Sequence, residues 1–311
     1  MAPNGGEPKN INGDSPLTIN ANPDPRELGP KPPFKEQTQQ HPGTVQALDP
    51  PADHGETSYI GRNRLADRVA IITGGDSGIG RAVAIAFARE GADVVLSYLP
   101  SEQNDAQSVS EIIEKSGRKA ICVPGDLQDP TYSRSLVSAA INRLGRLDTV
   151  VNNAAFQMVR ENIEDVSPEE LDRAFRTNVF GTFFLTQAAL AVLKPGASII
   201  NTTSIEAFTP EPGLLAYAAT KAAIANLTKS LAKLAKDKGV RVNGVAPGPV
   251  WTPLIPAIMP AEKVAKFGET TVFGRPAQPV ELAHLFVFLA SEDASYVSGE
   301  IYGATGGRMP V

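Results

Sequence analysis

"VAIITGGDSGIGRAVAIAFARE", residues 69–90, passes from a short apolar run through a glycine-rich turn into an alanine-rich apolar segment. The run before the glycines predicts a buried strand, and the segment after them predicts a helix. Glycine at positions 74, 75, 78 and 80 permits positive φ and a close approach of the backbone to a phosphate, whose charge a helix N-terminus stabilises. The stretch therefore predicts a phosphate-binding turn, with a merely tight turn as the alternative.

The same alternation of strand and helix continues along the chain from Leu65. Short apolar runs, separated by amphipathic helical segments, occupy residues 68–73, 92–98, 119–125, 147–154, 197–204, 240–248 and 300–307. Near-continuous apolar runs are typical of parallel strands that are covered on both faces. We therefore predict the α/β class, with a single doubly wound Rossmann domain whose seven-stranded parallel sheet is flanked by helices on both faces. Ligands of such sheets bind beyond the carboxyl ends of the strands.

Composition narrows the classes of function. The chain has 311 residues, a formal net charge of -5 and one cysteine, Cys122. An acidic chain without long basic runs is not expected to bind nucleic acid. No internal disulfide is possible, and no histidine has further metal ligands at a suitable spacing, so we expect no metal site. No apolar run reaches ~18 residues and no secretory signal is visible, which predicts a cytoplasmic protein without a membrane span.

The N-terminal segment differs from the rest of the chain. Residues 1–58 hold 11 of the 26 prolines and a single aromatic residue, Phe34. Such a stretch buries little apolar surface, which favours a disordered tail. The alternative is an extended arm that docks "PPFKEQTQQ" and "HGETSYIG" onto its own domain or a neighbouring subunit. Residues 59–311 are predicted to form the catalytic domain.

A helix predicted over residues 214–234 carries Tyr217 and Lys221 one turn apart, so both polar groups lie on one face. A phenol with a pKa of about 10 moves protons poorly at neutral pH. A nearby ammonium lowers that pKa, and Lys221 is placed to do so for Tyr217. In the alternative, Tyr217 is a half-buried core residue and Lys221 extends to water.

Two more polar residues stand at positions that need explaining. Ser204 ends the fifth apolar run, where its hydroxyl could bond a substrate oxygen or simply cap the strand. Asn178 lies in the apolar stripe of a helix predicted from Pro168, together with Leu171, Phe175, Thr182, Leu185 and Ala189. An unpaired amide there would cost about 1–3 kcal/mol, so Asn178 needs a structural or a functional partner.

The order of these strings resembles the short-chain dehydrogenase/reductase family. The resemblance rests on the TGxxxGxG spacing, on "NNAA" at 152–155, on Ser204 and on "YAATK" at 217–221, and it covers residues 65–308. It implies that Tyr217 is the acid or base and that Lys221 also holds the nicotinamide ribose. It further implies that Ser204 bonds the substrate carbonyl and that Asn178 holds a water linking Lys221 to solvent.

The resemblance implies an NAD(P)-dependent oxidoreductase that interconverts an aldehyde, ketone or sugar carbonyl and an alcohol, assembled as a homotetramer. The N-terminal arm, "GGDSGIGR", "PGDL" and "APGPVWTPL" resemble a stress-associated subgroup described as aldehyde or sugar reductases. The alternative is a non-catalytic regulatory or stress protein that senses nicotinamide nucleotides. The four filled positions favour the enzyme, because a sensor does not need Tyr217.

The cofactor choice depends on the end of the second strand. NAD-binding folds usually carry an acid there, whereas this chain has Ser97 and Tyr98, which favours NADP(H) over NAD(H). No adjacent arginine is available for a 2′-phosphate, so NAD(H) stays possible. The expected cofactor contacts, with Asn152 as a further candidate, are Gly74, Asp76, Ser77, Gly78, Ile79, Gly80, Ser97, Tyr98, Asp126, Leu127, Asn153, Ala154, Tyr217, Lys221, Pro247, Gly248, Val250 and Thr252.

Overall fold

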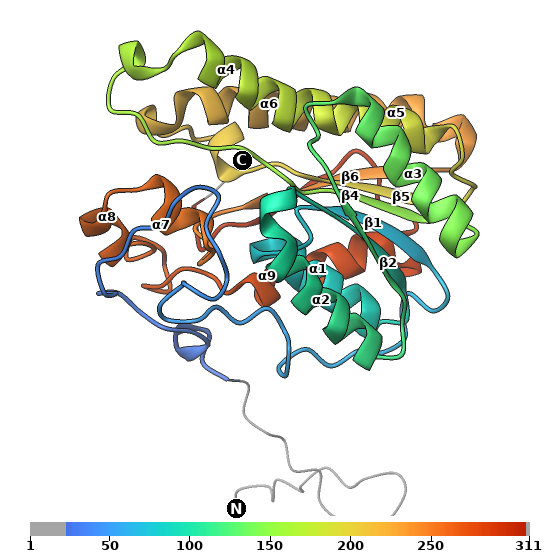
Figure 1. The fold of residues 1–311 in the computed structure, drawn as a ribbon, viewed down its shortest axis with the longest axis horizontal. Helices are drawn as coiled ribbons and strands as arrows, with labels where there is room; N and C mark the ends of the chain where they lie inside the picture. The colour runs from blue at the N-terminus through green and yellow to red at the C-terminus, as the bar shows by residue number, and fades with distance from the viewer. Residues whose placement is uncertain (1–22, 309–311) are drawn as a thin grey trace, which may run out of the picture.

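The computed structural model describes residues 23–308 and is built around one parallel sheet of seven strands (Figure 1). The strand order is β3-β2-β1-β4-β5-β6-β7. The strands are β1 Val69–Thr73, β2 Asp93–Tyr98, β3 Ala120–Pro124, β4 Thr149–Asn152, β5 Ser198–Thr202, β6 Arg241–Pro247 and β7 Ile301–Ala304. Each strand lies within one of the apolar runs, so the prediction of a doubly wound Rossmann domain is confirmed.

Helices cover both faces of the sheet, with α1, α2 and α9 on one face and α3 to α6 on the other (Figure 1). The helices that flank the sheet are α1 Gly78–Arg89, α2 Gln103–Lys115, α3 Pro130–Leu144, α4 Pro168–Ala174, α5 Gly181–Leu190, α6 Leu215–Leu234 and α9 Pro279–Ala290. Two short helices, α7 Leu254–Ile258 and α8 Ala261–Ala265, follow β6. The apolar core lies between each helical layer and the strands.

The order of the strands reverses next to β1. Ile71 of β1 lies opposite Val95 of β2 on one side and Val150 of β4 on the other. The chain first builds the sheet outward through β2 and β3, and then returns past β1 to start β4. A doubly wound sheet binds its ligand at such a reversal, beyond the carboxyl ends of the strands.

The helix predicted from Pro168 changes its winding halfway along. Its N-cap is Ser167, whose hydroxyl accepts the backbone N–H of Glu170 at 3.1 Å. After α4 the chain forms a π-helical segment, Phe175–Phe180, before α5 continues to Leu190. Of the expected stripe, Asn178, Thr182, Leu185 and Ala189 are buried, whereas Leu171 is 43% exposed. The expectation that Leu171 belongs to the buried face is therefore wrong.

Residues 23–58 pack against the domain. The ring of Phe34 stacks on Trp251 with 4.3 Å between centroids, and the Trp251 indole N–H donates to the carbonyl of Pro50 at 2.8 Å. Tyr59, directly after this segment, donates its hydroxyl proton to the buried carboxylate of Glu90 at 2.6 Å. The structure thus places both "PPFKEQTQQ" and "HGETSYIG" on the chain's own domain. Residues 1–22 of the expected tail lie outside the described residues.

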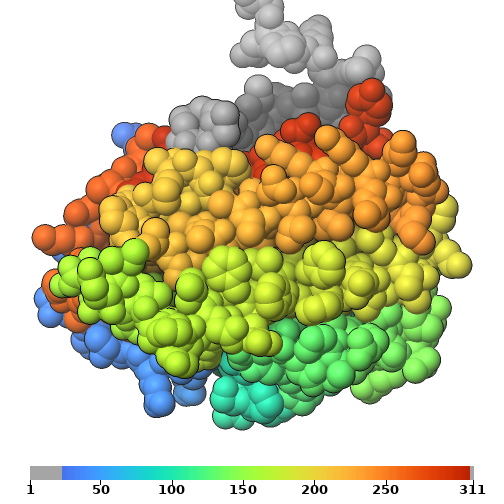
Figure 2. Space-filling view, turned by 90° about the horizontal axis from the view of Figure 1, so that it is seen from above, coloured from blue at the N-terminus to red at the C-terminus, as the bar shows by residue number. Residues whose placement is uncertain are grey.

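The face formed by α4, the π-helical segment, α5 and α6 carries large exposed apolar side chains. Figure 2 looks onto this face, where the yellow-green α4–α5 segment lies beside the gold to orange α6. Leu171, Phe180, Phe183 and Leu215 on these elements are each 43–48% exposed. Within residues 23–308, no helix combines the length and the apolar character needed to cross a membrane.

Candidate active site

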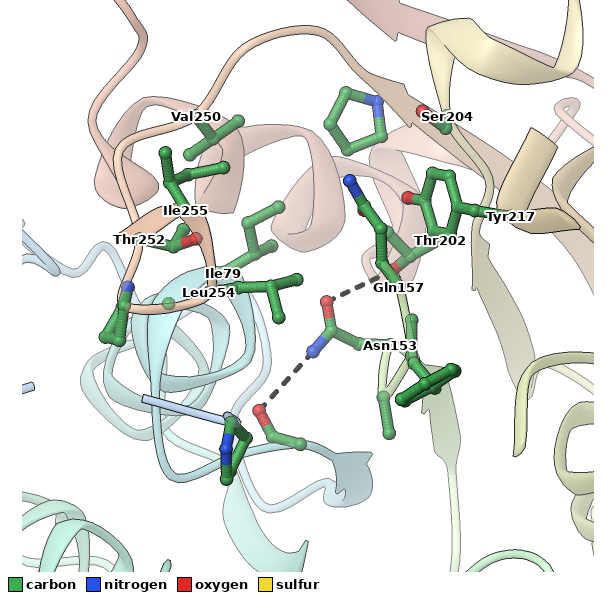
Figure 3. Close-up of a pocket in the computed structure, with 18 of the residues that line it drawn as sticks. Ile79, Asn153, Gln157, Thr202, Ser204, Tyr217, Val250, Thr252, Leu254 and Ile255 are labelled. Carbon is green, nitrogen blue, oxygen red and sulfur yellow. Dashed lines mark hydrogen bonds between the residues drawn. The ribbon is translucent and has the colours of Figure 1, made fainter. Parts of the chain in front are cut away.

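A cavity of about 620 Å³ opens at the carboxyl ends of the central strands, where the strand order reverses. Its walls come from the glycine loop after β1, from the segments after β2 to β6, and from α6 and α7. Cofactor and small-molecule sites usually have volumes of roughly 300–1,000 Å³. Figure 3 shows Ser204 and Tyr217 on one side of the cavity, across from Val250, Thr252, Leu254 and Ile255.

The glycine loop forms a cradle that a side chain would fill. Gly74 and Gly78 have φ of +61° and +50°. A Cβ on Gly80 would lie 1.8 Å from the carbonyl oxygen of Gly74, so only glycine lets α1 begin this close to β1. The N-cap Ser77 makes no side-chain capping hydrogen bond, which leaves the first N–H groups of α1 to another acceptor. This cradle fits the pyrophosphate of a dinucleotide. Gly80 supports the turn but does not line the cavity.

Tyr217, Lys221 and Ser204 meet in the wall of the cavity. Tyr217 is half-buried and lines the cavity with Ser204, and its hydroxyl points into the cavity (Figure 3). Lys221 is 2% exposed, and its Nζ lies 5.4 Å from the centroid of the Tyr217 ring. The ammonium donates to the backbone carbonyl of Thr202 at 2.7 Å. Lys221 therefore does not extend to water, as the alternative would require.

Burial sets the protonation of this pair. It raises the pKa of Tyr217, and the hydrogen bond with Ser204 offsets only part of that effect. It also lowers the pKa of Lys221 from 10.5 to about 7. The expectation that Lys221 lowers the pKa of Tyr217 is wrong for the protein alone, because a low-dielectric wall disfavours the charged form of both groups.

Asn178 is buried behind the cavity and does not line it. Its Oδ1 accepts the N–H of Phe156 at 2.7 Å, and its Nδ2 donates to the carbonyl of Phe156 at 2.9 Å and to the Thr220 hydroxyl at 3.0 Å. These bonds tie the segment after β4 to α6. The partners are structural, and the amide has no further hydrogen to give.

The two asparagines at the end of β4 face different ways. Asn153 lines the cavity and donates to the carbonyl of Thr73 at 3.0 Å. It also accepts the Thr202 hydroxyl at 3.4 Å (Figure 3). Asn152 instead donates to Asn201 at 2.8 Å inside the sheet. Asn153 is therefore the member of the pair that can reach a ligand.

The structure brings the remaining expected contact residues to the same cavity. They are Gly74, Asp76, Ser77, Gly78, Ile79, Ser97, Tyr98, Asp126, Leu127, Asn153, Ala154, Pro247, Gly248, Val250 and Thr252. Sequence reasoning missed several lining residues: His41, Pro42, Glu102, Gln157 and Arg173. Gln157 follows β4, so the rule that ligands bind beyond strand ends could have found it. His41 and Pro42 belong to the N-terminal segment, whose docking no local pattern revealed.

The side of the cavity beyond β4 to β7 combines apolar and cationic side chains. Leu254, Ile255, Met259 and Phe267 come from the segment after β6, as do Lys263 and Lys266, while Arg173 follows β4 and Arg308 follows β7. Trp251 anchors this segment to Phe34 and does not line the cavity. Across residues 23–308, no group of three or more His, Cys, Asp or Glu is arranged to hold a metal ion.

Comparison with known proteins agrees with this geometry. A family model described as enoyl-(acyl carrier protein) reductase matches residues 74–308. An uncharacterized oxidoreductase of Bacillus subtilis is 51% identical over 278 residues, covering 88% of this chain and 93% of the relative. General stress protein 39 of the same organism is 44% identical, covering 92% and 98%. A glucose and ribitol dehydrogenase of Daucus carota is 43% identical, covering 90% and 98%.

Solved structures show the same fold with nicotinamide cofactors. A short-chain dehydrogenase from Burkholderia cenocepacia in complex with NADP has a TM-score of 0.74 at 31% identity, covering 79% of this chain and 99% of that chain. A 3-ketoacyl-(acyl-carrier-protein) reductase from Brucella melitensis complexed with NADH has a TM-score of 0.72 at 32% identity, covering 78% and 99%. The chain belongs to the short-chain dehydrogenase/reductase family of oxidoreductases.

Proposed function

We propose that this protein interconverts a carbonyl and an alcohol with a nicotinamide dinucleotide, with Tyr217 as the acid or base. The observation that carries the proposal is the Tyr217 hydroxyl, which points into the cavity beside Ser204 with the buried Lys221 behind its ring (Figure 3). The glycine cradle and Asn153 lie on the same cavity and fit the pyrophosphate and the nicotinamide side of the cofactor.

The bound nicotinamide supplies the hydride in the reducing direction and accepts it in the other. Ser204 can hold the carbonyl oxygen, and Tyr217 gives that oxygen a proton as it becomes an alkoxide. The ammonium of Lys221 stabilises the phenolate that remains, which then regains its proton from solvent. In the oxidising direction the phenolate removes the hydroxyl proton of the alcohol. We propose that Asn178 binds the water that links Lys221 to solvent. An oxygen of Asn178 accepts a hydrogen bond from this water, because both amide hydrogens are already donated to other groups.

The substrate is proposed to be a small aldehyde, ketone or sugar. The apolar side chains after β6 suit a short carbon chain, while Gln157 and the cationic side chains that follow β4 to β7 can bond hydroxyl groups. The Daucus carota relative, named a glucose and ribitol dehydrogenase, supports the sugar branch of this proposal.

A matched pair of tyrosine variants tests the mechanism. Tyr217→Phe removes only the hydroxyl, and Tyr296→Phe does the same at a fully exposed tyrosine outside the cavity. We expect Tyr217→Phe to lower kcat with an aldehyde and sugar panel by about 100-fold or more, the usual size of acid–base catalysis, and Tyr296→Phe to leave it unchanged. Nucleotide binding measured by calorimetry should persist in both. Equal rates for Tyr217→Phe and the parent would refute the mechanism. Binding without turnover in the parent would favour the nucleotide sensor.

We also propose a cytoplasmic homotetramer. The exposed Leu171, Phe180, Phe183 and Leu215 lie on the elements that form one face, where burial against a second copy would remove apolar surface from water. A monomeric mass by light scattering at working concentration would contradict this assembly.

A further inference from the structure

Two carboxylates in the cavity lining follow β1 and β2, across the strand reversal from the cationic side chains that follow β4 to β7. Asp76 of the glycine loop is 1% exposed, and its Oδ2 is buried without a hydrogen-bond partner. Glu102, just after β2, lines the same cavity beside Ser97 and Tyr98. Its Oε2 accepts the N–H of Leu99 at 2.9 Å, which fixes the carboxylate against the strand end. Asp76 is part of the cavity lining, so a bound ligand can supply the missing donor when the side chain turns toward the cavity.

This side of the cavity is where a dinucleotide fold places the adenosine ribose. The acid that bonds the ribose hydroxyls in NAD-binding folds lies about 20 residues past the glycine loop, close to Ser97 and Tyr98 in this chain. We infer that Asp76 and Glu102 form a carboxylate wall that accepts hydrogen bonds from the ribose diol of NAD(H) and excludes the 2′-phosphate of NADP(H). The inference rests on the proposed function, because it concerns the cofactor of the same cavity.

The charges around the cavity support this choice. Asp76, Glu102 and Asp126 follow β1, β2 and β3, and no Lys or Arg after these strands is part of the described lining. The cationic lining residues all follow β4 to β7: Arg173, Lys221, Lys263, Lys266 and Arg308. A 2′-phosphate would therefore lie beside acidic side chains without a cation to bind it.

Arg81 of α1 does not fill this role. Its Nε donates to Glu56 at 3.0 Å and its Nη1 donates to Ser108 at 2.7 Å, and it lies outside the cavity lining. Burial raises the pKa of Asp76, and burial together with the charge of Asp76 raises the pKa of Glu102. Hydroxyl donors from a ribose would stabilise the charged carboxylates, whereas a phosphate dianion would add to the repulsion.

The inference reverses the cofactor expectation drawn from the sequence. That expectation considered only Ser97 and Tyr98 at the strand end, where an acid is usually found. The structure supplies carboxylates from a preceding loop and a following turn, which a fixed offset from the glycines does not reveal.

Equilibrium binding tests the wall directly. Dissociation constants for NAD⁺, NADH, NADP⁺ and NADPH are measured by calorimetry on the full chain and on Glu102→Gln, which keeps the size of the side chain and an acceptor for Leu99. We expect the parent to bind NAD(H) at least about 10-fold tighter than NADP(H), and Glu102→Gln to reduce that ratio about 10-fold, mainly by tightening NADP(H). Glu111→Gln, an exposed change on the following helix α2, should leave the ratio unchanged.

A second variant tests the buried oxygen. Asp76→Asn replaces an acceptor by a donor and should weaken NAD(H) binding about 10-fold or more, with circular dichroism reporting whether the fold is kept. Because Glu102 is only partly buried, its variant decides the inference even if Asp76→Asn does not fold. Tighter binding of NADP(H) by the parent, or an unchanged ratio in Glu102→Gln, would overturn the wall and leave the proposed enzyme intact. Binding of neither nucleotide would overturn both.

Discussion

Replacing Lys221 by methionine should stabilise the protein in the absence of cofactor while removing its activity. The ammonium is 2% exposed and donates to one backbone carbonyl, and burial alone lowers its pKa. Methionine has a similar length and no charge to bury. The variant therefore separates the energetic cost of this side chain from its chemical use.

The size of the effect follows from the pKa. A fall from 10.5 to about 7 corresponds to roughly 5 kcal/mol at 1.36 kcal/mol per pKa unit. Between these values the unfolded chain binds the proton and the folded chain does not, so stability rises with pH through this window. The cost is fully present below pH 7 and is gone above pH 10.5. Leaving the Thr202 carbonyl without its donor costs the variant about 1–3 kcal/mol, so the net gain near pH 6 is about 2–4 kcal/mol.

Urea unfolding of the parent and of Lys221→Met from pH 6 to pH 10, without nucleotide, measures this difference. The variant should be more stable at pH 6 and should lose its advantage by pH 10. Lys229→Met, an exposed change on the same helix, serves as the control and should show no such dependence. A Lys221→Met protein that is less stable than the parent at pH 6, or a difference that does not vary with pH, would refute the reasoning.

Three further changes probe other parts of the molecule. Burial raises the pKa of Glu90, but the hydrogen bonds from Arg64 and Tyr59 outweigh burial and lower the pKa from 4.5 to about 2. The stability that the Glu90 carboxylate contributes is therefore lost as the pH falls through that range. Glu90→Gln should therefore cost about 3 kcal/mol at pH 7 and flatten the acid side of the urea-unfolding profile; an unchanged profile would contradict the assignment. Phe34→Ala should loosen the N-terminal segment and speed hydrogen exchange there, whereas parent-like exchange would show that the stacking on Trp251 does not anchor it. Phe183→Glu should lower the mass measured by light scattering, and an unchanged tetramer would place the interface elsewhere.

The sequence predicts the parts of the fold that a local pattern determines, such as an apolar run or a fixed spacing between residues. Parallel strands that are covered on both faces favour apolar residues at most positions, so β1 to β7 lie within the apolar runs. The tight β1–α1 junction needs glycine, because a Cβ at Gly80 would clash with Gly74. The helical turn between Tyr217 and Lys221 places both on one face before any coordinates are known.

The features that escape prediction depend on what surrounds a residue in space. The sign of the Tyr217 pKa shift is set by burial, which no i,i+4 spacing reports. The exposure of Leu171 depends on which elements pack against α4, which the helical spacing does not report. His41 reaches the cavity through a segment whose composition is typical of disorder, since its anchoring depends on the distant Trp251.

The same cavity contains both of the unfavourable burials described above. Lys221 is a buried cation without a carboxylate partner, and Asp76 has a buried oxygen without a donor. Residues that only stabilise a fold are not retained in this state, because each costs free energy in the protein alone. One dinucleotide can relieve both costs. The hydroxyls of its adenosine ribose can donate to Asp76, and those of its nicotinamide ribose can accept from Lys221. Cofactor binding should therefore be coupled to folding stability through these two residues. The polar groups of Lys221 and Asp76 that lower the stability of the protein alone are the groups that position the bound cofactor.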